Sequence, residues 1–563
     1  MMDHLQVIFS YGLRMWYENK LSLLATLGAP LGVLFHLTIA QMGDVEDFMY
    51  TLIPAMALTA FGIFSAFVYL GSSILGALAE LGVLITTFNT GLFSSMVIYR
   101  LFFHRLRKFP GPLDLKISRF FSAFMVAKEA KYHKDVARLH EKYGDFIRVG
   151  PRNLCIVRQS AVPTIYGANS NCHKSTWYTF TDPDHNYVSL NTCRDPMEHK
   201  RRRKPWDKAF SVKSLQTYEP RIRTLVNQLV HQISEREVIN VADWSNYLGF
   251  DIMGEVGFGE NFDCVSSGIK SPVIQAIQSH MYFIGVLSHV PWLLSIFGKI
   301  PGASKEFHPF LDYCQSQVDK KRESLAFEKE PRDIMSWVIK AVIDKDVSAS
   351  PTESSLRDDA RLVIIAGSET SATTLANTLF FLAKYPHVLK KLQAEIDSVI
   401  PTPADWTYEK VRTIKYIDNV IDESQRLKPA LLTGGYRQTP PEGLQIDEQF
   451  IPGNVSVFVP TQLIHTDPRY WKQNMEFIPE RFGERSDEMG TNGAPFMPFS
   501  LGSYGCVGKQ LAMMVLRIAV SRLVQHFDVS FADGETGEAF DTGAKDVFTT
   551  TLQPLVLKFS PRI

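Results

Sequence analysis

The sequence predicts a mainly α-helical protein with a small β region, preceded by membrane-spanning helices. Three observations support this fold class: an apolar region over residues 1–108, a proline-rich break over 109–113, and a remainder, 114–563, in which helical apolar periodicity outweighs a few short apolar runs. At 563 residues the chain exceeds the length that one hydrophobic core usually supports. We therefore predict a membrane region, a hinge and one large globular domain.

Composition narrows the class of protein. Lys plus Arg and Asp plus Glu each total 59, so the net charge is zero and gives no support to nucleic-acid binding. The cysteines have no paired spacing, which argues against a disulfide framework and a zinc site. This pattern fits a reducing, cytosol-facing compartment. The six cysteines are Cys155, Cys172, Cys193, Cys264, Cys314 and Cys506.

Three N-terminal stretches are long and apolar enough to cross a membrane: Leu21–Ala40, Thr51–Leu70 and Leu81–Phe103. At 1.5 Å per residue, each covers a hydrocarbon core of roughly 30 Å. Only a short small-residue stretch that contains Glu80 separates the second from the third. The segment Met1–Lys20 is long, mixed in charge and aromatic, so a cleavable signal peptide is not expected. We predict two to three transmembrane helices and favour three.

The charges beside these stretches predict the orientation. Four basic residues follow the last stretch: Arg100, Arg105, Arg107 and Lys108. The positive-inside rule therefore places the globular domain in the cytosol. Arg14 and Lys20 favour the same side for the N-terminus, whereas three spans place the two ends on opposite sides. Either one stretch is re-entrant or the weaker N-terminal bias is overruled.

The segment 109–113 breaks any helix, because Pro110 and Pro112 remove backbone donors and restrict the preceding residues. We interpret it as a hinge. Beyond it, the short apolar runs Phe146–Val149 and Leu154–Val157 are separated by turn residues and predict strands of a small sheet.

A cysteine between glycines lies near the C-terminus, in the segment Phe499–Gly508. Cys506 directly precedes an apolar helical run, Leu511–Val520, and the amides and dipole of a helix N-terminus lower a thiol pKa. Cys506 is therefore a candidate thiolate ligand for a metal, although a lone cysteine is more often a small buried apolar residue. Glycines remove side chains where the backbone must approach something large and flat. Those glycines are Gly502, Gly505 and Gly508.

A long apolar helix is predicted from about Thr352 to Lys384, ending before Pro386. At its centre, Glu369 and Thr370 form an acid-alcohol pair. A carboxylate inside a buried helix is costly unless it serves a purpose. The alternative is an exposed Glu369 beside a Thr370 that bonds to the preceding helical turn.

Two further motifs carry charge. Glu423 and Arg426 lie one helical turn apart, a spacing that in most helices makes only a surface pair worth about a few tenths of a kcal/mol. Downstream, Arg481 lies in the segment Pro479–Phe482. The segment His199–Phe210 is strongly basic, which fits a solvated helix face or a membrane-surface contact as well as a functional helix.

Together these segments resemble the cytochrome P450 family. The family motifs F-x-x-G-x-R-x-C-x-G, A/G-G-x-D/E-T-T/S, E-x-x-R and P-E-R-F have counterparts in the family's order between Pro110 and Pro561. The resemblance implies the cytochrome P450 fold and a membrane-anchored, fungal-type haem-thiolate monooxygenase. It makes Cys506 the axial ligand of the iron of haem b. It also makes Glu369 and Thr370 a proton relay, with Gly367 leaving room for dioxygen.

The resemblance also implies residues that contact haem or support its site. Arg203 and Arg437 match positions that bind the haem propionates. The cysteine loop itself contributes Phe499, Gly502 and Tyr504. A buried ion triad that supports this loop in the family is matched by Glu423, Arg426 and Arg481.

Two positions depart from the family pattern. Tyr504 stands where arginine is usual, and His199 stands where tryptophan is usual. A phenol offers only a neutral hydrogen bond, about half as strong as a charge-assisted one. Propionate binding must therefore depend on other cations.

The resemblance further implies the partners and the compartment. Electrons would come from NADPH through NADPH-cytochrome P450 reductase, with cytochrome b5 as a second candidate donor, and cations beside Arg203 would dock the acidic surface of that donor. We expect the endoplasmic reticulum membrane, with the catalytic domain facing the cytosol. The substrate would be a hydrophobic terpenoid, polyketide or alkaloid of secondary metabolism. The segments expected to border it are Ser175–Pro196, Ala430–Gly435 and Phe548–Thr551.

Two other classes of protein compete with this hypothesis. A haem-thiolate isomerase or dehydratase needs no external electrons, but such family members tend to lose the acid-alcohol pair, so Glu369 and Thr370 favour oxygen activation. A non-catalytic membrane scaffold would be expected to lose Cys506 and its glycines, and their presence disfavours it.

Overall fold

The computed structural model describes residues 2–41, 48–181, 188–300, 302, 308–328 and 330–562. The chain forms two compact units. One comprises Met1–Arg119 and Arg148–Pro151, and the other comprises Phe120–Ile147 and Arg152–Ile563. The first unit thus extends a few residues beyond the proline-rich segment at 109–113.

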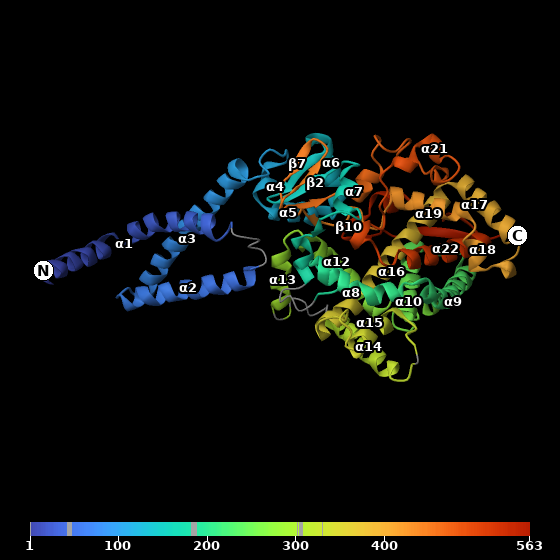
Figure 1. Ribbon diagram of the computed structural model, residues 1–563, viewed down its shortest axis with the longest axis horizontal. Helices are drawn as coiled ribbons and strands as arrows, with labels where there is room; N and C mark the ends of the chain where they lie inside the picture. Colours follow the sequence, from blue (N-terminus) through green and yellow to red (C-terminus); the bar gives the residue numbers. More distant parts are fainter. Residues whose placement is uncertain are drawn as a thin grey trace. The chain divides into compact units, whose positions relative to one another are not determined.

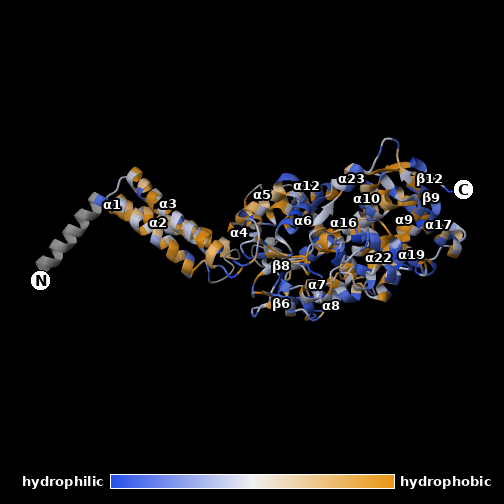
Figure 2. Cartoon of the chain, turned by 90° about the horizontal axis from the view of Figure 1, so that it is seen from above, coloured by the Kyte–Doolittle hydropathy of each residue, from blue (hydrophilic) through white to orange (hydrophobic). Residues whose placement is uncertain are grey.

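Three apolar helices dominate the first unit, and Figure 2 colours much of their described length orange. They are α1 (Met2–Thr38), α2 (Met49–Tyr69) and α3 (Ile74–Ile98), the last continued by a π-helical turn, Tyr99–Phe103. Each contains a stretch long and apolar enough to cross a membrane: Asn19–Thr38, Thr51–Tyr69 and Ile74–Phe103. The third stretch begins earlier than the sequence predicts, because Glu80 lies inside α3 rather than before it.

A buried ion pair explains how α3 tolerates Glu80. Lys20 Nζ lies 2.7 Å from Glu80 Oε2 and donates to Ser72 Oγ at 2.6 Å, while Ser72 Oγ donates to Glu80 at 3.1 Å. An ionised side chain among apolar helices is costly alone and acceptable when paired. The pair therefore joins α1 to the start of α3.

The helices α1 and α3 pack closely and run in the same direction. A Cβ on Gly32 would collide with the Phe88 carbonyl, so the two backbones approach as small residues allow. At the start of the pair Lys20 meets Glu80, and further along His36 Nδ1 lies 2.7 Å from Ser95 Oγ. Residues later in α1 contact residues later in α3, so the two helices are parallel. The helix α2 connects them and would run in the opposite direction.

We expect this arrangement to place the segment before Asn19 and the segment after Phe103 on opposite membrane faces. An acceptor sequon for N-glycosylation fused before Met1 should be modified in microsomes, because three crossings put it in the lumen. The same sequon fused after Ile563 should stay unmodified. Modification at both ends or at neither would contradict a three-crossing anchor.

The second unit is mainly helical, which confirms the predicted fold class. Figure 1 shows α16, α10 and α22 together in its interior. Its longer helices, each of eight residues or more, are α5 (Arg119–Glu129), α6 (Tyr132–Tyr143), α8 (Pro196–Ala209), α9 (Val212–Arg236), α10 (Val241–Gly257), α12 (Pro272–Leu287), α13 (Pro291–Lys299), α14 (His308–Leu325), α15 (Ile334–Ile343), α16 (Glu353–Lys384), α17 (Pro386–Val399), α19 (Lys415–Leu427) and α22 (Lys509–His526).

The central helix α16 forms where its sequence signals predict it. Thr352 caps it, its Oγ1 accepting from Ser355 N at 3.0 Å, and the helix ends at Lys384, two residues before Pro386. It packs against α10, α14, α19 and α22. A Cβ on Gly249 of α10 would lie 2.6 Å from the Ser368 carbonyl, so glycine permits this close crossing.

The β region consists of one five-stranded sheet and smaller pieces. The sheet has the order β1-β2-β8-β5-β3, and its first two strands confirm the predicted pair. In it, β2 and β8 are parallel, whereas β8, β5 and β3 are antiparallel neighbours. The five strands are β1 (Phe146–Gly150), β2 (Asn153–Ile156), β8 (Ser456–Phe458), β5 (Arg437–Gln438) and β3 (His173–Lys174).

A three-stranded sheet and two hairpins complete the β region. The three strands have the order β4-β12-β9, with bounds Val238–Asn240, Val556–Pro561 and Phe527–Phe531. The hairpins pair β6 (Leu444–Ile446) with β7 (Gln449–Ile451), and β10 (Lys545–Val547) with β11 (Thr549–Thr551). The strand β11 packs against α16 and thereby brings the predicted last substrate turn to the central helix.

Candidate active site

The cysteine loop holds Cys506 directly before α22. Cys506 N donates to the Phe499 carbonyl at 2.9 Å, and Gly505 N donates to the Gly502 carbonyl at 2.9 Å, so two tight turns fix the loop. Gly502 has a φ of +61°, and a Cβ there would lie 2.5 Å from the Gly167 carbonyl. Only glycine fits that position.

The side chain of Cys506 is exposed although protein atoms surround much of it. The side chain has accessible surface, yet desolvation by surrounding protein is the largest influence on its pKa and raises it. The amide of Gly508, the charge of Arg203 and the amide of Lys509 act in the opposite direction. A coordinated metal cation would add the remaining stabilisation that a thiolate needs, so this donor set fits a metal-bound thiolate.

One face of α16 is not fully covered by other parts of the protein. Ala366 is exposed and Ile365 and Thr370 are half-buried, although they lie in the middle of a helix whose C-terminal half is almost wholly buried. Gly367 does not lie on this open face. It faces α10, where a Cβ would collide with the side chain of Met253. Its missing side chain therefore makes room for Met253, and Ala366 is the residue that lines the open face.

The structure agrees with one alternative for Glu369 and with the other for Thr370. Glu369 is buried, its Oε2 accepts a hydrogen bond from Thr549 Oγ1 of β11 at 2.8 Å, and burial raises its pKa to about 7. The exposed-glutamate alternative is therefore wrong. Thr370 does bond to the preceding turn, because its Oγ1 donates to the Ala366 carbonyl at 2.7 Å.

The three residues of the predicted ion triad lie together and are fully buried. Arg426 Nε lies 2.7 Å from Glu423 Oε2, and Arg481 Nε lies 3.0 Å from Glu423 Oε1. The remaining donors of both guanidinium groups bind backbone carbonyls, including that of His465 at 3.0 Å. The surface-pair alternative for Glu423 and Arg426 is therefore wrong.

The triad is connected to the cysteine loop. Arg426 binds the carbonyl of His465, and His465 Nε2 accepts from Met497 N at 2.9 Å. Met497 lies two residues before Phe499, whose carbonyl holds Cys506 N. A continuous set of contacts, buried as far as Met497, thus connects Glu423 to the thiol-bearing turn.

The basic segment His199–Phe210 falls within and just after α8 and presents two faces. Arg203 Nη1 donates to the Gly505 carbonyl at 2.8 Å, so one face contacts the cysteine loop. The other face carries Lys200, Lys204 and Lys208, which are exposed and spaced four residues apart. The exposed lysines fit a solvated helix face, whereas Arg203 contacts the cysteine loop; its predicted role in binding a propionate stays a prediction.

Comparison with known proteins decides the family. The family model for cytochrome P450 matches residues 110–559. The chain belongs to the cytochrome P450 family. Like other members, this P450 belongs to a group of oxidoreductases whose haem iron is held by a thiolate.

Similar P450 proteins come from fungi. A cytochrome P450 monooxygenase of Eupenicillium brefeldianum is 37% identical over 474 residues, 84% of this chain and 94% of the relative. One of Fusarium pseudograminearum is 34% identical over 545 residues, 94% and 96% of the two chains. Tryprostatin B 6-hydroxylase of Aspergillus fumigatus is 32% identical over 489 residues, 85% of each. The chain is a P450 monooxygenase.

Two P450 site residues escaped the sequence analysis. Thr549 lies in the predicted last turn, but nothing in its neighbourhood marks it as the partner of Glu369. Lys174 is buried, and its Nζ donates to the carbonyls of Leu190 and Asn191 at 3.0 and 2.6 Å. A lysine that ends a two-residue strand carries no periodic pattern that would predict its burial.

The predicted substrate-bordering loop Ser175–Pro196 is described except for residues 182–187, which lie outside the described residues. The side chains of Trp177 and Tyr178 are buried. Trp177 stacks on Tyr436 with ring centroids 5.2 Å apart and lies 4.8 Å from the ring of Phe548. These aromatics therefore pack in the protein interior, beside the predicted last turn.

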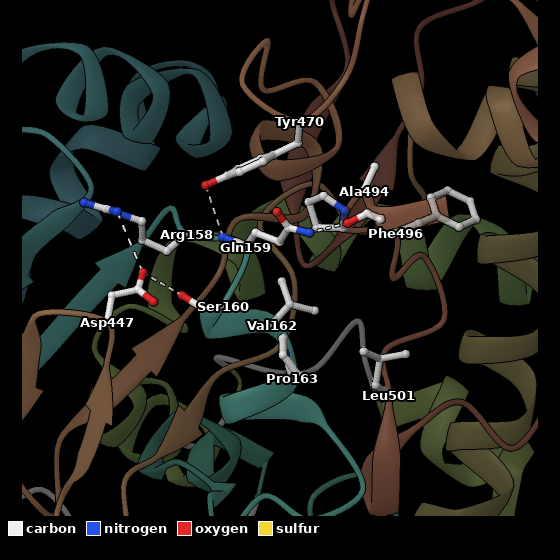
Figure 3. A pocket seen from close by; sticks show the side chains of 12 residues that line it. Arg158, Gln159, Ser160, Val162, Pro163, Asp447, Tyr470, Ala494, Phe496 and Leu501 are labelled. Carbon is white, nitrogen blue, oxygen red and sulfur yellow. Dashed lines mark hydrogen bonds and ion pairs between the residues drawn. The ribbon is translucent and has the colours of Figure 1, made fainter. Parts of the chain in front are cut away.

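A surface cleft of about 610 Å³ lies apart from these residues, although Leu501 of the cysteine loop lines one edge (Figure 3). Its polar side chains bind one another: Ser160 Oγ donates to Asp447 at 2.8 Å, and Tyr470 Oη accepts from Gln159 N at 3.3 Å. None of the residues that line it is a cysteine. The predicted site residues Cys506, Glu369 and Thr370 do not line this cleft.

We expect Glu423→Gln to lower the free energy of unfolding by about 3–5 kcal/mol, because it leaves two buried guanidinium groups without an anion. Urea unfolding of the detergent-solubilised chain, followed by tryptophan fluorescence, measures the change. The matched control is Glu198→Gln, which removes a surface carboxylate paired with Arg201 at the same helical spacing. That control should cost less than about 1 kcal/mol. Equal effects in the two variants would contradict a supporting role for the triad.

Proposed function

We propose that this P450 monooxygenase oxidises a hydrophobic secondary-metabolite intermediate, with Cys506 as the axial thiolate of haem b iron. The proposal rests above all on the thiol of Cys506, which is exposed at the start of α22 on a loop fixed by tight turns, with the Gly508 and Lys509 amides and the charge of Arg203 favouring its thiolate form. When bound there, haem supplies dioxygen activation, which thiolate ligation favours. Phe499 and Gly502 would shape the wall beside it.

The chain's own residues would supply protons and exclude water. Glu369 has a pKa of about 7, so near neutral pH its carboxyl group both holds and releases a proton. Its neighbour Thr370 has a hydroxyl on the half-open face of α16, bonded to the Ala366 carbonyl. We assign the proton relay to these two residues and the water exclusion to the apolar face around Ile365.

The residues on the open face of α16 and beside the last turn suggest the substrate class. Ile365 and Ala366 present only apolar atoms, and the aromatic group of Trp177, Tyr436 and Phe548 lies beside the last turn. This environment suits a terpenoid, polyketide or alkaloid skeleton. Because a relative hydroxylates tryprostatin B, that compound belongs in the first substrate panel.

Electrons would come from NADPH through NADPH-cytochrome P450 reductase, with cytochrome b5 as a second donor. The stripe of Lys200, Lys204 and Lys208 suits the acidic surface of such a partner and lies on the helix whose Arg203 contacts the cysteine loop. The basic residues after α3 support insertion into the endoplasmic reticulum membrane with the catalytic unit in the cytosol. The intact pair of Glu369 and Thr370 disfavours an electron-independent isomerase or dehydratase.

The first test is the carbon-monoxide difference spectrum of the reduced protein in microsomes. The wild-type chain should give the strongly red-shifted Soret band of thiolate-ligated haem and should form product only when NADPH is supplied. Cys506→Ala should lose both the band and the product, because no thiolate remains. A variant that retained both would overturn the assignment of Cys506, and product without NADPH would favour the isomerase class.

A second test addresses the proton held by Glu369. Thr549→Val removes a hydrogen bond that stabilises the charged carboxylate, so the pKa of Glu369 should rise above its present value of about 7. If the protonated acid is the form that delivers the proton, the alkaline fall in product formed per NADPH consumed should move to higher pH. The control is Thr551→Val on the same strand. An unchanged pH profile in Thr549→Val would contradict this role.

A further inference from the structure

The two positions that depart from the family pattern are in contact. The rings of His199 and Tyr504 lie with centroids 4.7 Å apart. Burial and the neighbouring cations Lys174, Arg203 and Arg437 lower the pKa of His199 to about 3, which keeps the imidazole neutral. The pair therefore fills the space of a tryptophan and an arginine but supplies no positive charge.

The positive charge beside Tyr504 comes instead from two residues of the five-stranded sheet. The register of β3 and β5 sets Lys174 directly opposite Arg437. Lys174 Nζ and Arg437 Cζ each lie 5.1 Å from the ring centroid of Tyr504. Like charges directly opposite one another on paired strands are destabilising, so this arrangement requires a compensating anion.

The described part of the chain does not provide that anion. Lys174 binds two carbonyl groups, and burial together with the charge of Arg437 lowers its pKa well below the ordinary value. Arg437 donates to the phenol of Tyr178 and to its neighbour's carbonyl, while its buried Nε has no hydrogen-bond partner. The buried hydroxyl of Tyr504 is also without one.

We propose that Lys174 takes over the charge of the arginine absent at position 504 and, with Arg437 and Tyr504, binds a haem propionate. The free Nε of Arg437 and the Tyr504 hydroxyl donate to the carboxylate, and the Lys174 ammonium balances its charge. Charge-assisted hydrogen bonds are about twice as strong as neutral ones, so the lysine compensates for the weaker phenol. This inference rests on the proposed ligation of haem by Cys506.

The test measures haem retention by the purified full chain, as the rate of haem transfer to excess apomyoglobin. Lys174→Met should lose haem about tenfold faster or more, because a charged hydrogen-bonding group is removed from a buried anion. The double variant Lys174→Met/Tyr504→Arg restores the charge at the position usual in the family and should return the rate to within about twofold of wild type. The control Lys213→Met removes an exposed lysine of α9 and should leave the rate unchanged.

Circular dichroism of each variant distinguishes haem loss from unfolding. Wild-type retention in a folded Lys174→Met would overturn the inference, as would a double variant that loses haem as fast as the single one. If Lys174→Met kept its haem but bound a carboxylate-bearing substrate more weakly, the anion would be a substrate carboxylate rather than a propionate, which also overturns it. A wild-type protein without a thiolate-type spectrum would instead refute the ligation by Cys506.

Discussion

The cysteine loop is held by buried contacts that begin at the carboxylate of Glu423. From there they pass through Arg426 and the backbone of His465, and His465 in turn binds the amide of Met497. The carbonyl of Phe499 then holds the amide of Cys506. Glu423, Arg426, His465 and Met497 are buried, where an unmade hydrogen bond costs more than a made one contributes. The position of the thiol therefore depends on a carboxylate more than eighty residues earlier in the sequence.

A second set of buried charges meets the same loop and differs in one respect. In the triad, the carboxylate of Glu423 neutralises both guanidinium groups from within the chain. Around Tyr504, by contrast, Lys174 and Arg437 face one another across paired strands. The charges of the triad balance one another within the chain, and the triad supports the fold. The second set is complementary to an anionic group that is not part of the polypeptide, which is the property expected of a cofactor site.

Two features occur in both the membrane unit and the catalytic unit: paired buried charges, and glycines at close helix contacts. Lys20 and Glu80 satisfy each other inside an apolar helix pair, as the triad residues do in the catalytic core. Glycine at Gly32 lets α1 approach α3, and Gly249 lets α10 cross α16. In both units, charge is buried only with a partner, and close helix contacts depend on small residues.

The sequence by itself determined the fold class, the bounds of α16, the strands β1 and β2, and the presence of an iron-ligand candidate at Cys506. These features are encoded locally, in apolar periodicity, caps, prolines and short motifs. Tertiary structure alone decided that Glu80 lies inside α3, that Gly367 accommodates Met253, that Thr549 binds Glu369 from 180 residues away, and that Lys174 lies opposite Arg437. Helix crossings and strand register create these contacts between residues distant in sequence, so no local spacing could have predicted them.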